Sequence, residues 1–153
     1  MIEIDTLPTA SGTYVLVLEL NRPHVLTIGR LGEVKLPAGV MAYAGSAFGS
    51  GGLRARLGRH LRGDGAKHWH IDHVRAVAEV RNCFYTVSDT RLECAWSQAL
   101  AALPGATIPV PGFGSSDCRS GCGAHLIALP PRVNLQRVLA EVTRSLVMRL
   151  QLR

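Results

Sequence analysis

The stretch that decides the fold reads YAGSA over residues 43–47 and GGLRARLGRHLR over residues 51–62. The first part is typical of a strand that ends in a glycine-rich turn, and the second predicts a helix with four arginines, one histidine and no acidic residue. Leu53, Leu57 and Leu61 recur every four residues and form the predicted buried stripe of that helix. Arg56 and His60, also four apart, lie beside this stripe, so we expect both side chains to project toward the strand end.

Composition favours a polyanionic partner. The 153-residue chain carries 17 Lys and Arg against 11 Asp and Glu, a net charge of +6 at pH 7. Lysine is confined to Lys35 and Lys67, and the remaining basic residues are arginines, whose guanidinium groups bind phosphate in a bidentate fork. We therefore expect nucleic acid as the partner, although a GC-rich genome would also raise the arginine content.

The length indicates one domain over residues 1–153, with a core over about 10–130 and a C-terminal helix over about 134–150. No apolar run approaches the ~20 residues that a membrane span needs, so no membrane partner is expected. Glu3 and Asp5 stand where a signal peptide would carry positive charge, which predicts a cytoplasmic protein. Its four cysteines are then expected to be reduced.

The apolar pattern predicts an α+β fold with a mainly antiparallel central sheet flanked by helices, an extra hairpin, and an amphipathic C-terminal helix. The C-terminal helix would pack on the domain or pair with a second copy, which leaves a monomer and a homodimer open. Strands are expected at 12–20, 24–28, 33–36, 40–45, 76–87 and 125–129, and helices at 51–62, about 90–103 and about 134–150.

Two tripeptides and three later residues resemble the GIY-YIG nucleases. Gly12-Thr13-Tyr14 and Tyr43-Ala44-Gly45 match the tripeptides that name that family, and Arg56 and His60 fall in the register of its catalytic helix. Glu93, with Trp96 three residues later, matches the glutamate of a later helix that holds a metal ion in that family. The ordered set in matching strand and helix context is more specific than either tripeptide alone.

Further segments are similar to the small stand-alone, Uri-type branch of the same superfamily. The shared patterns are GGL at 51–53 with Arg56, HWHID at 68–72, LEC at 92–94 with Trp96, and GFGSSDC at 112–118. Together they span roughly residues 12–127.

The resemblance implies hydrolysis of phosphodiester bonds. Glu93 would hold one Mg²⁺, or Mn²⁺, with waters completing the octahedron, and Arg56 would stabilise charge on the phosphoryl oxygens. Tyr14 or Tyr43 would deprotonate or orient the attacking water, with His60 assisting, and both tyrosines stay open as candidates. A tyrosine pKa near 10 must be depressed before the phenol can act as a base at neutral pH.

Basic and glycine-rich positions around this set are predicted to contact DNA, with RNA as an alternative. Backbone N–H groups of the glycine turn can bind phosphate, although a plain helix-entry turn explains the same glycines. The predicted contacts are Gly45, Ser46, Gly52, Arg54, Arg59, Arg62, Lys67, His68 and His70.

Several candidate residues also have a purely structural interpretation. Tyr14 on a central strand would often serve packing, and Thr90-Arg91-Leu92-Glu93 spells a capping box that would use the Glu93 carboxylate. Asp72 is expected to orient a site histidine or arginine by contacting it on the side away from the substrate. His68, His70 and Asp72 would share one face of a strand, whereas a helix beginning near Trp69 would scatter them.

Cys118, Cys122 and His125 have the spacing of metal ligands but lack a fourth ligand at a standard distance, for which Cys94 and His68 are the candidates. Ser116, Asp117 and Cys118 are otherwise expected at the rim of the site, with His125. The sequence therefore predicts a divalent-metal-dependent endonuclease acting on DNA, in repair or in defence. Its alternatives are a catalytically inactive nucleic-acid-binding module and a zinc-stabilised interaction protein.

Overall fold

A five-stranded antiparallel sheet forms the centre of the computed structural model, which describes residues 3–63, 65–115 and 121–150. Its order is β6-β4-β1-β5-β7, so β1 lies in the middle, as the apolar run over residues 14–18 predicts. The α+β prediction is confirmed. The strands are β1 (Gly12–Leu20), β4 (Gly39–Ala47), β5 (Glu79–Val87), β6 (Leu126–Ala128) and β7 (Met148–Arg149).

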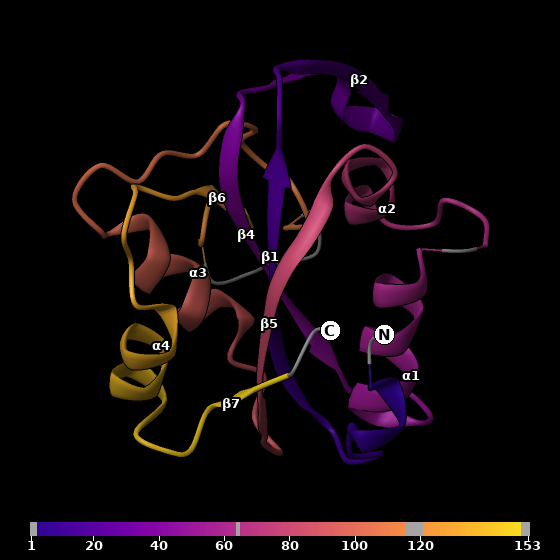
Figure 1. The fold of residues 1–153 in the computed structure, drawn as a ribbon, viewed down its shortest axis with the longest axis vertical. Helices are drawn as coiled ribbons and strands as arrows, with labels where there is room; N and C mark the ends of the chain where they lie inside the picture. Colours follow the sequence, from indigo (N-terminus) through magenta and orange to yellow (C-terminus); the bar gives the residue numbers. More distant parts are fainter. Residues whose placement is uncertain (1–2, 64, 116–120, 151–153) are drawn as a thin grey trace.

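Helices cover both faces of this sheet (Figure 1). Side chains alternate along β1, so Tyr14 and Leu16 face α1 (Gly52–Arg62) and α2 (His70–Arg75). Val15 and Val17 face α3 (Glu93–Ala101) and α4 (Leu135–Thr143) on the other side. Two separate buried clusters result, one on each face.

The α1 prediction holds in detail. Leu53, Leu57 and Leu61 are all buried in the cluster on the β1 face that carries Tyr14. The helix begins after Gly51, which takes the left-handed conformation with φ of 81°, and ends before Gly63, also left-handed with φ of 69°. The short 3-10 helix η1 (Ile4–Thr6) packs beside α1.

The predicted hairpin between the two tyrosine strands is also present. It consists of β2 (His24–Ile28), the 3-10 turn η2 (Gly29–Leu31) and β3 (Gly32–Leu36), which pair only with each other among the described strands. In Figure 1 it lies at the top of the molecule near α2, away from the ends of β1 and β4 that carry the tyrosine motifs. The insertion therefore leaves β1 and β4 in direct register.

Three element boundaries differ from the sequence prediction by three or more residues. The C-terminal helix ends at Thr143 instead of near residue 150, because Arg144 turns left-handed with φ of 53° and the chain then adds β7 to the free edge of β5. Residues 76–78 close α2 before β5 begins at Glu79. Helix α3 begins at Glu93 instead of Thr90, because residues 88–90 form a side-chain turn. Among the described residues, no helix combines the length and apolar character needed to cross a membrane.

Candidate active site

Tyr14 and Tyr43 lie on adjacent central strands, on the sheet face that α1 covers. Their ring centroids are 6.5 Å apart. Tyr14 is 1% exposed and Tyr43 8% exposed, so Tyr43 is the phenol nearer the surface. The two motif tyrosines therefore lie close together in the fold.

His60 on α1 joins this pair. Its Nε2 lies 2.9 Å from the Tyr14 hydroxyl, and its ring centroid is 6.4 Å from that of Tyr43. On the other side of the ring, Nδ1 lies 3.7 Å from Oδ1 of Asp72. Burial lowers the pKa of His60 to about 4, and although Asp72 opposes this shift, nearby arginines reinforce it. His60 is thus neutral near pH 7 and available to accept the Tyr14 proton in a hydrogen bond.

Asp72 binds the site arginine Arg59 and lies beside the site histidine His60. Its carboxylate accepts hydrogen bonds from both terminal nitrogens of Arg59, at 3.0 and 3.2 Å, and from the backbone N–H groups of His68 and Trp69. Burial would raise the pKa of Asp72, but these hydrogen bonds outweigh it and hold the pKa below its usual value. Helix α2 begins at His70 because Asp72 caps it, which scatters the histidines instead of aligning them on a strand.

Arg56 lies where its guanidinium can face the two tyrosines. Its Nη1 donates a hydrogen bond of 3.3 Å to the carbonyl of Ser46, and its Cζ lies 4.3 Å from the ring centroid of Trp69. Arg59 lies over the same ring at 4.4 Å. Trp69 therefore orders two cations through cation–π contacts. A shallow cavity of about 190 Å³ opens here, lined by residues of the glycine turn together with Arg56, Arg59 and Trp69.

Glu93 is the first residue of α3, and its carboxylate does not close a capping box. The N-cap is Leu92, which makes no side-chain cap hydrogen bond, so that structural interpretation of Glu93 is wrong. Its Oε2 atom is buried and has no hydrogen-bond partner among the described residues. Burial raises the pKa of Glu93, while Arg91 and Arg56 oppose the rise. A buried carboxylate oxygen without a donor fits a cation ligand, because an unpartnered acceptor in this position is otherwise costly.

Both tyrosines differ in one respect from the sequence expectation. Burial raises the pKa of Tyr14, and Tyr43 adds to the rise, while Arg56 only partly offsets it. Burial likewise raises the pKa of Tyr43, against the opposing effect of Arg56. Neither phenol is therefore a tyrosinate near neutral pH, and each can act in this state through its hydroxyl hydrogen bond.

Several predicted nucleic-acid contacts are engaged inside the protein. Arg54 donates hydrogen bonds to the carbonyls of Leu7 and Asp5, which ties α1 to the N-terminal segment. His70 accepts a 2.9 Å hydrogen bond from the backbone N–H of Gly114. Gly52 donates its N–H to the Gly49 carbonyl, as a helix-entry turn requires.

The other predicted contacts divide into buried and exposed positions. Gly45 and Ser46 are buried at the end of β4, where Gly45 packs beneath Tyr14. Arg62, Lys67 and His68 are exposed near the end of α1 and the start of α2. The rim predictions for Ser116, Asp117 and Cys118 lie outside the described residues. His125 is buried and lies with Cys94 and Cys122 instead of at an open rim.

Sequence reasoning missed the part played by Trp69. No local pattern shows that its ring contacts Arg56 and Arg59, because both cations reach it from α1. Arg75 was also missed, because no local pattern shows that it donates hydrogen bonds to the carbonyls of His60 and Leu61. Those contacts hold the end of α1 beside α2.

Comparisons with known proteins give one family match. A family model described as a domain of unknown function, DUF123, matches residues 13–148. Comparisons with curated proteins and with solved structures found no significant match. The matched range includes Tyr14, Tyr43, Arg56, His60 and Glu93.

Proposed function

The chain belongs to the DUF123 family, and from the geometry of its candidate site we propose that it is a divalent-metal-dependent endonuclease that hydrolyses phosphodiester bonds in DNA. The observation that carries this proposal is the position of Glu93. Its Oε2 is buried and has no hydrogen-bond partner among the described residues. Glu93 belongs to a helix on the other face of the sheet, yet its charge raises the pKa of Tyr43, and the charge of Arg56 lowers the pKa of Glu93.

The five residues of the site supply complementary chemistry. Arg56 is a permanent cation suited to stabilising charge that develops on phosphoryl oxygens, and Trp69 limits its freedom. Tyr14 is held by His60, which in turn faces Asp72. The imidazole thus holds the Tyr14 hydroxyl, while the Asp72 carboxylate, 3.7 Å from Nδ1, lies beyond hydrogen-bond distance and acts on the ring through its charge.

Glu93 is the residue that would hold Mg²⁺ or Mn²⁺, because both ions prefer oxygen ligands and keep several waters. When bound, the metal would offset charge on the leaving oxygen. Tyr43 lies closer to the surface than Tyr14 and senses the charges of both Arg56 and Glu93, so we assign it the contact with the attacking water or the phosphate. Tyr14 and His60 would then support Tyr43 from the interior.

The surrounding surface fits a polyanion. The shallow cavity beside Arg56 is bounded by the glycine turn, and the exposed Arg62, Lys67 and His68 continue from the far end of α1 into the loop before α2. The larger cavity of about 730 Å³ lies at Gly39 and Val40, the opposite end of β4 from the tyrosine motif. The shallow cavity beside Arg56 therefore lies next to the proposed chemistry, and the larger cavity does not.

Cleavage assays with purified protein test the proposal. Supercoiled plasmid, single-stranded DNA and RNA are each incubated with Mg²⁺ or Mn²⁺, and products are followed on gels. We expect DNA cleavage that falls at least about 100-fold in Arg56→Ala and Glu93→Gln, since each removes a charge that acts on the transition state. Arg144→Ala, which removes a cation at the C-terminal end of α4, is the matched control and should cleave like the wild type.

Two outcomes would redirect the interpretation. Binding of DNA without cleavage under any metal would identify a nucleic-acid-binding module whose catalytic set has become structural. Equal cleavage by wild type and by both site variants would assign the activity to a contaminant. Circular dichroism of each variant confirms that a lost activity is not a lost fold.

A further inference from the structure

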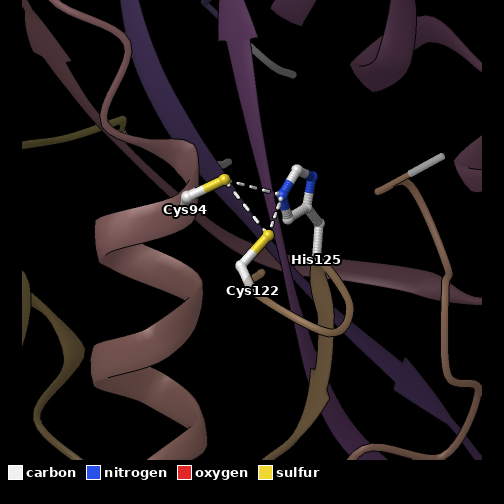
Figure 2. A group of neighbouring side chains, drawn as sticks. All are labelled: Cys94, Cys122 and His125. Carbon is white, nitrogen blue, oxygen red and sulfur yellow. Dashed lines mark hydrogen bonds between the residues drawn. The ribbon is translucent and has the colours of Figure 1, made fainter. Parts of the chain in front are cut away.

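Three side chains with soft or borderline metal-binding atoms converge outside the proposed nuclease site (Figure 2). The Sγ atoms of Cys94 and Cys122 are 3.1 Å apart. Nε2 of His125 lies 3.0 Å from the Cys122 sulfur and 3.5 Å from the Cys94 sulfur. Figure 2 shows all three side chains pointing toward one another from two separate parts of the chain.

Secondary structure and backbone hydrogen bonds position the segments that carry Cys94 and His125. Cys94 lies in the first turn of α3, and His125 directly precedes β6. The N–H of His125 donates to the Phe113 carbonyl at 2.7 Å, and its own carbonyl accepts from Ala44 at 2.9 Å. The cluster is thus built by the fold and does not depend on one flexible side chain.

The imidazole presents one ring nitrogen to the two sulfurs. Nε2 faces both sulfur atoms, while Nδ1 lies beside Gly114, where a Cβ atom built on the glycine would be 3.7 Å from it. Histidine ligands of zinc are commonly oriented by a contact at the second ring nitrogen, which leaves the lone pair of the first nitrogen for the ion.

We propose that Cys94, Cys122 and His125 bind a Zn²⁺ ion. Two thiolates and an imidazole are typical zinc ligands, and softness excludes Mg²⁺ and Ca²⁺ from such a set. Bond lengths of ~2.3 Å to sulfur and ~2.0 Å to nitrogen give ligand separations of about 3.5–3.8 Å in a tetrahedron. The three atoms therefore need to separate by only about half an ångström to admit the ion.

A disulfide fits the cluster less well. It needs sulfurs ~2.05 Å apart and gives no role to an imidazole beside both of them. Cys118 lies outside the described residues, so the proposed site consists of Cys94, Cys122 and His125.

The ion would join α3 to the segment before β6. Cys94 directly follows Glu93, so the same bond would fix the first turn of α3 and with it the Glu93 carboxylate. Zinc binding itself does not depend on the proposed nuclease function. Only the consequence for Glu93 as a magnesium ligand rests on the proposed nuclease function.

Elemental analysis of the intact protein tests the site. Protein purified under reducing conditions from zinc-supplemented cultures should contain about one zinc ion per chain, with at least about tenfold less in Cys94→Ala and His125→Gln. Cys83→Ala is the matched control, because Cys83 is a buried cysteine of β5 outside the cluster, and it should keep its zinc. Glu93→Gln should also keep zinc, so loss of nuclease activity there is separable from loss of this site.

A second measurement on the wild-type protein avoids any folding defect in the variants. Replacing zinc by Co²⁺ should give thiolate-to-cobalt charge-transfer absorption, and zinc should protect two thiols from a thiol reagent. Zinc that stays far below one per chain after reduction and reconstitution would overturn the proposal. So would a Cys94–Cys122 disulfide detected by mass spectrometry in protein that binds no zinc.

Discussion

Tyr14 and Gly45 lie directly opposite each other on β1 and β4, and the tyrosine ring covers the glycine. A Cβ atom built on Gly45 would lie 2.5 Å from the Tyr14 hydroxyl oxygen and 2.6 Å from its Cζ. Packing against Tyr14 therefore explains the glycine of the Tyr-x-Gly tripeptide. This glycine leaves the space that the tyrosine of the Gly-x-Tyr tripeptide fills.

Gly45→Ala is expected to displace Tyr14 from His60. The added methyl group has no room at the buried end of β4, so the free energy of unfolding should fall by about 1–3 kcal/mol. Urea unfolding followed by circular dichroism measures this loss. If the proposed function holds, cleavage should fall as well, because the Tyr14–His60 hydrogen bond is broken.

Gly49→Ala is the matched control for this substitution. No described atom lies within 4 Å of a Cβ built on Gly49, which belongs to the turn that follows the same strand. Its stability should stay within about 0.5 kcal/mol of the wild type. An equal loss in both variants would show that backbone flexibility, and not the space under Tyr14, explains the glycine.

Neutral His60 makes the stability of the protein depend on pH. The folded-state pKa of about 4 lies below the unfolded value of about 6.5, so protonation favours the unfolded chain. This contribution is complete above pH 6.5 and is lost as the pH falls toward 4, by up to about 3 kcal/mol. Urea unfolding at several pH values should show this decline for the wild type, with a shallower slope in His60→Gln.

His24→Gln provides the comparison for this pH dependence. His24 begins β2 on the hairpin, and its Nδ1 faces the carbonyl of Arg22, far from the tyrosine site. The variant should keep the wild-type slope between pH 4 and 6.5. A wild-type slope in His60→Gln as well would mean that another group causes the decline, and an NMR titration of the histidine rings would identify it.

Asp72 is expected to contribute more to stability than a surface acid. Asp72→Asn removes the charge from a carboxylate that binds Arg59 at two points and accepts two backbone N–H groups, with a side chain only 12% exposed. We expect a loss of about 2 kcal/mol in the free energy of unfolding. Glu141→Gln breaks an exposed Arg137 ion pair at 3.3 Å on α4 and should cost less than about 0.5 kcal/mol. Similar losses in the two variants would contradict the role given to Asp72.

The sequence predicts most of the sheet because its strands follow simple local rules. The largely apolar segment from Gly12 to Leu20 is the central strand, and the leucine spacing in α1 identifies the face that is buried. The end of the C-terminal helix is different. Leu146 continues the helical stripe in the sequence but is 73% exposed, because pairing of β7 with β5 satisfies backbone groups that no local pattern reveals.

The candidate site is less predictable than the sheet, because its environment arises from tertiary contacts. The order of the tyrosines, Arg56, His60 and Glu93 is visible in the sequence, but the burial that raises the tyrosine pKa values is not. Two further contacts also depend on the folded chain. Arg54 donates a hydrogen bond to a backbone carbonyl, and Cys94 lies beside Cys122 and His125. Residue identity thus predicts which groups take part, and the fold determines their protonation and partners.

Arg144 offers a direct test of where the C-terminal helix ends. Its φ of 53° is left-handed, a conformation that costs a residue with a Cβ atom and that glycine adopts freely. Arg144→Gly should therefore raise the free energy of unfolding by about 0.5–1 kcal/mol, measured by urea unfolding. Arg137→Gly, inside α4, should instead lower it by about 1 kcal/mol. If the helix continued to residue 150, both substitutions would place glycine in a helix interior, and both would destabilise the protein.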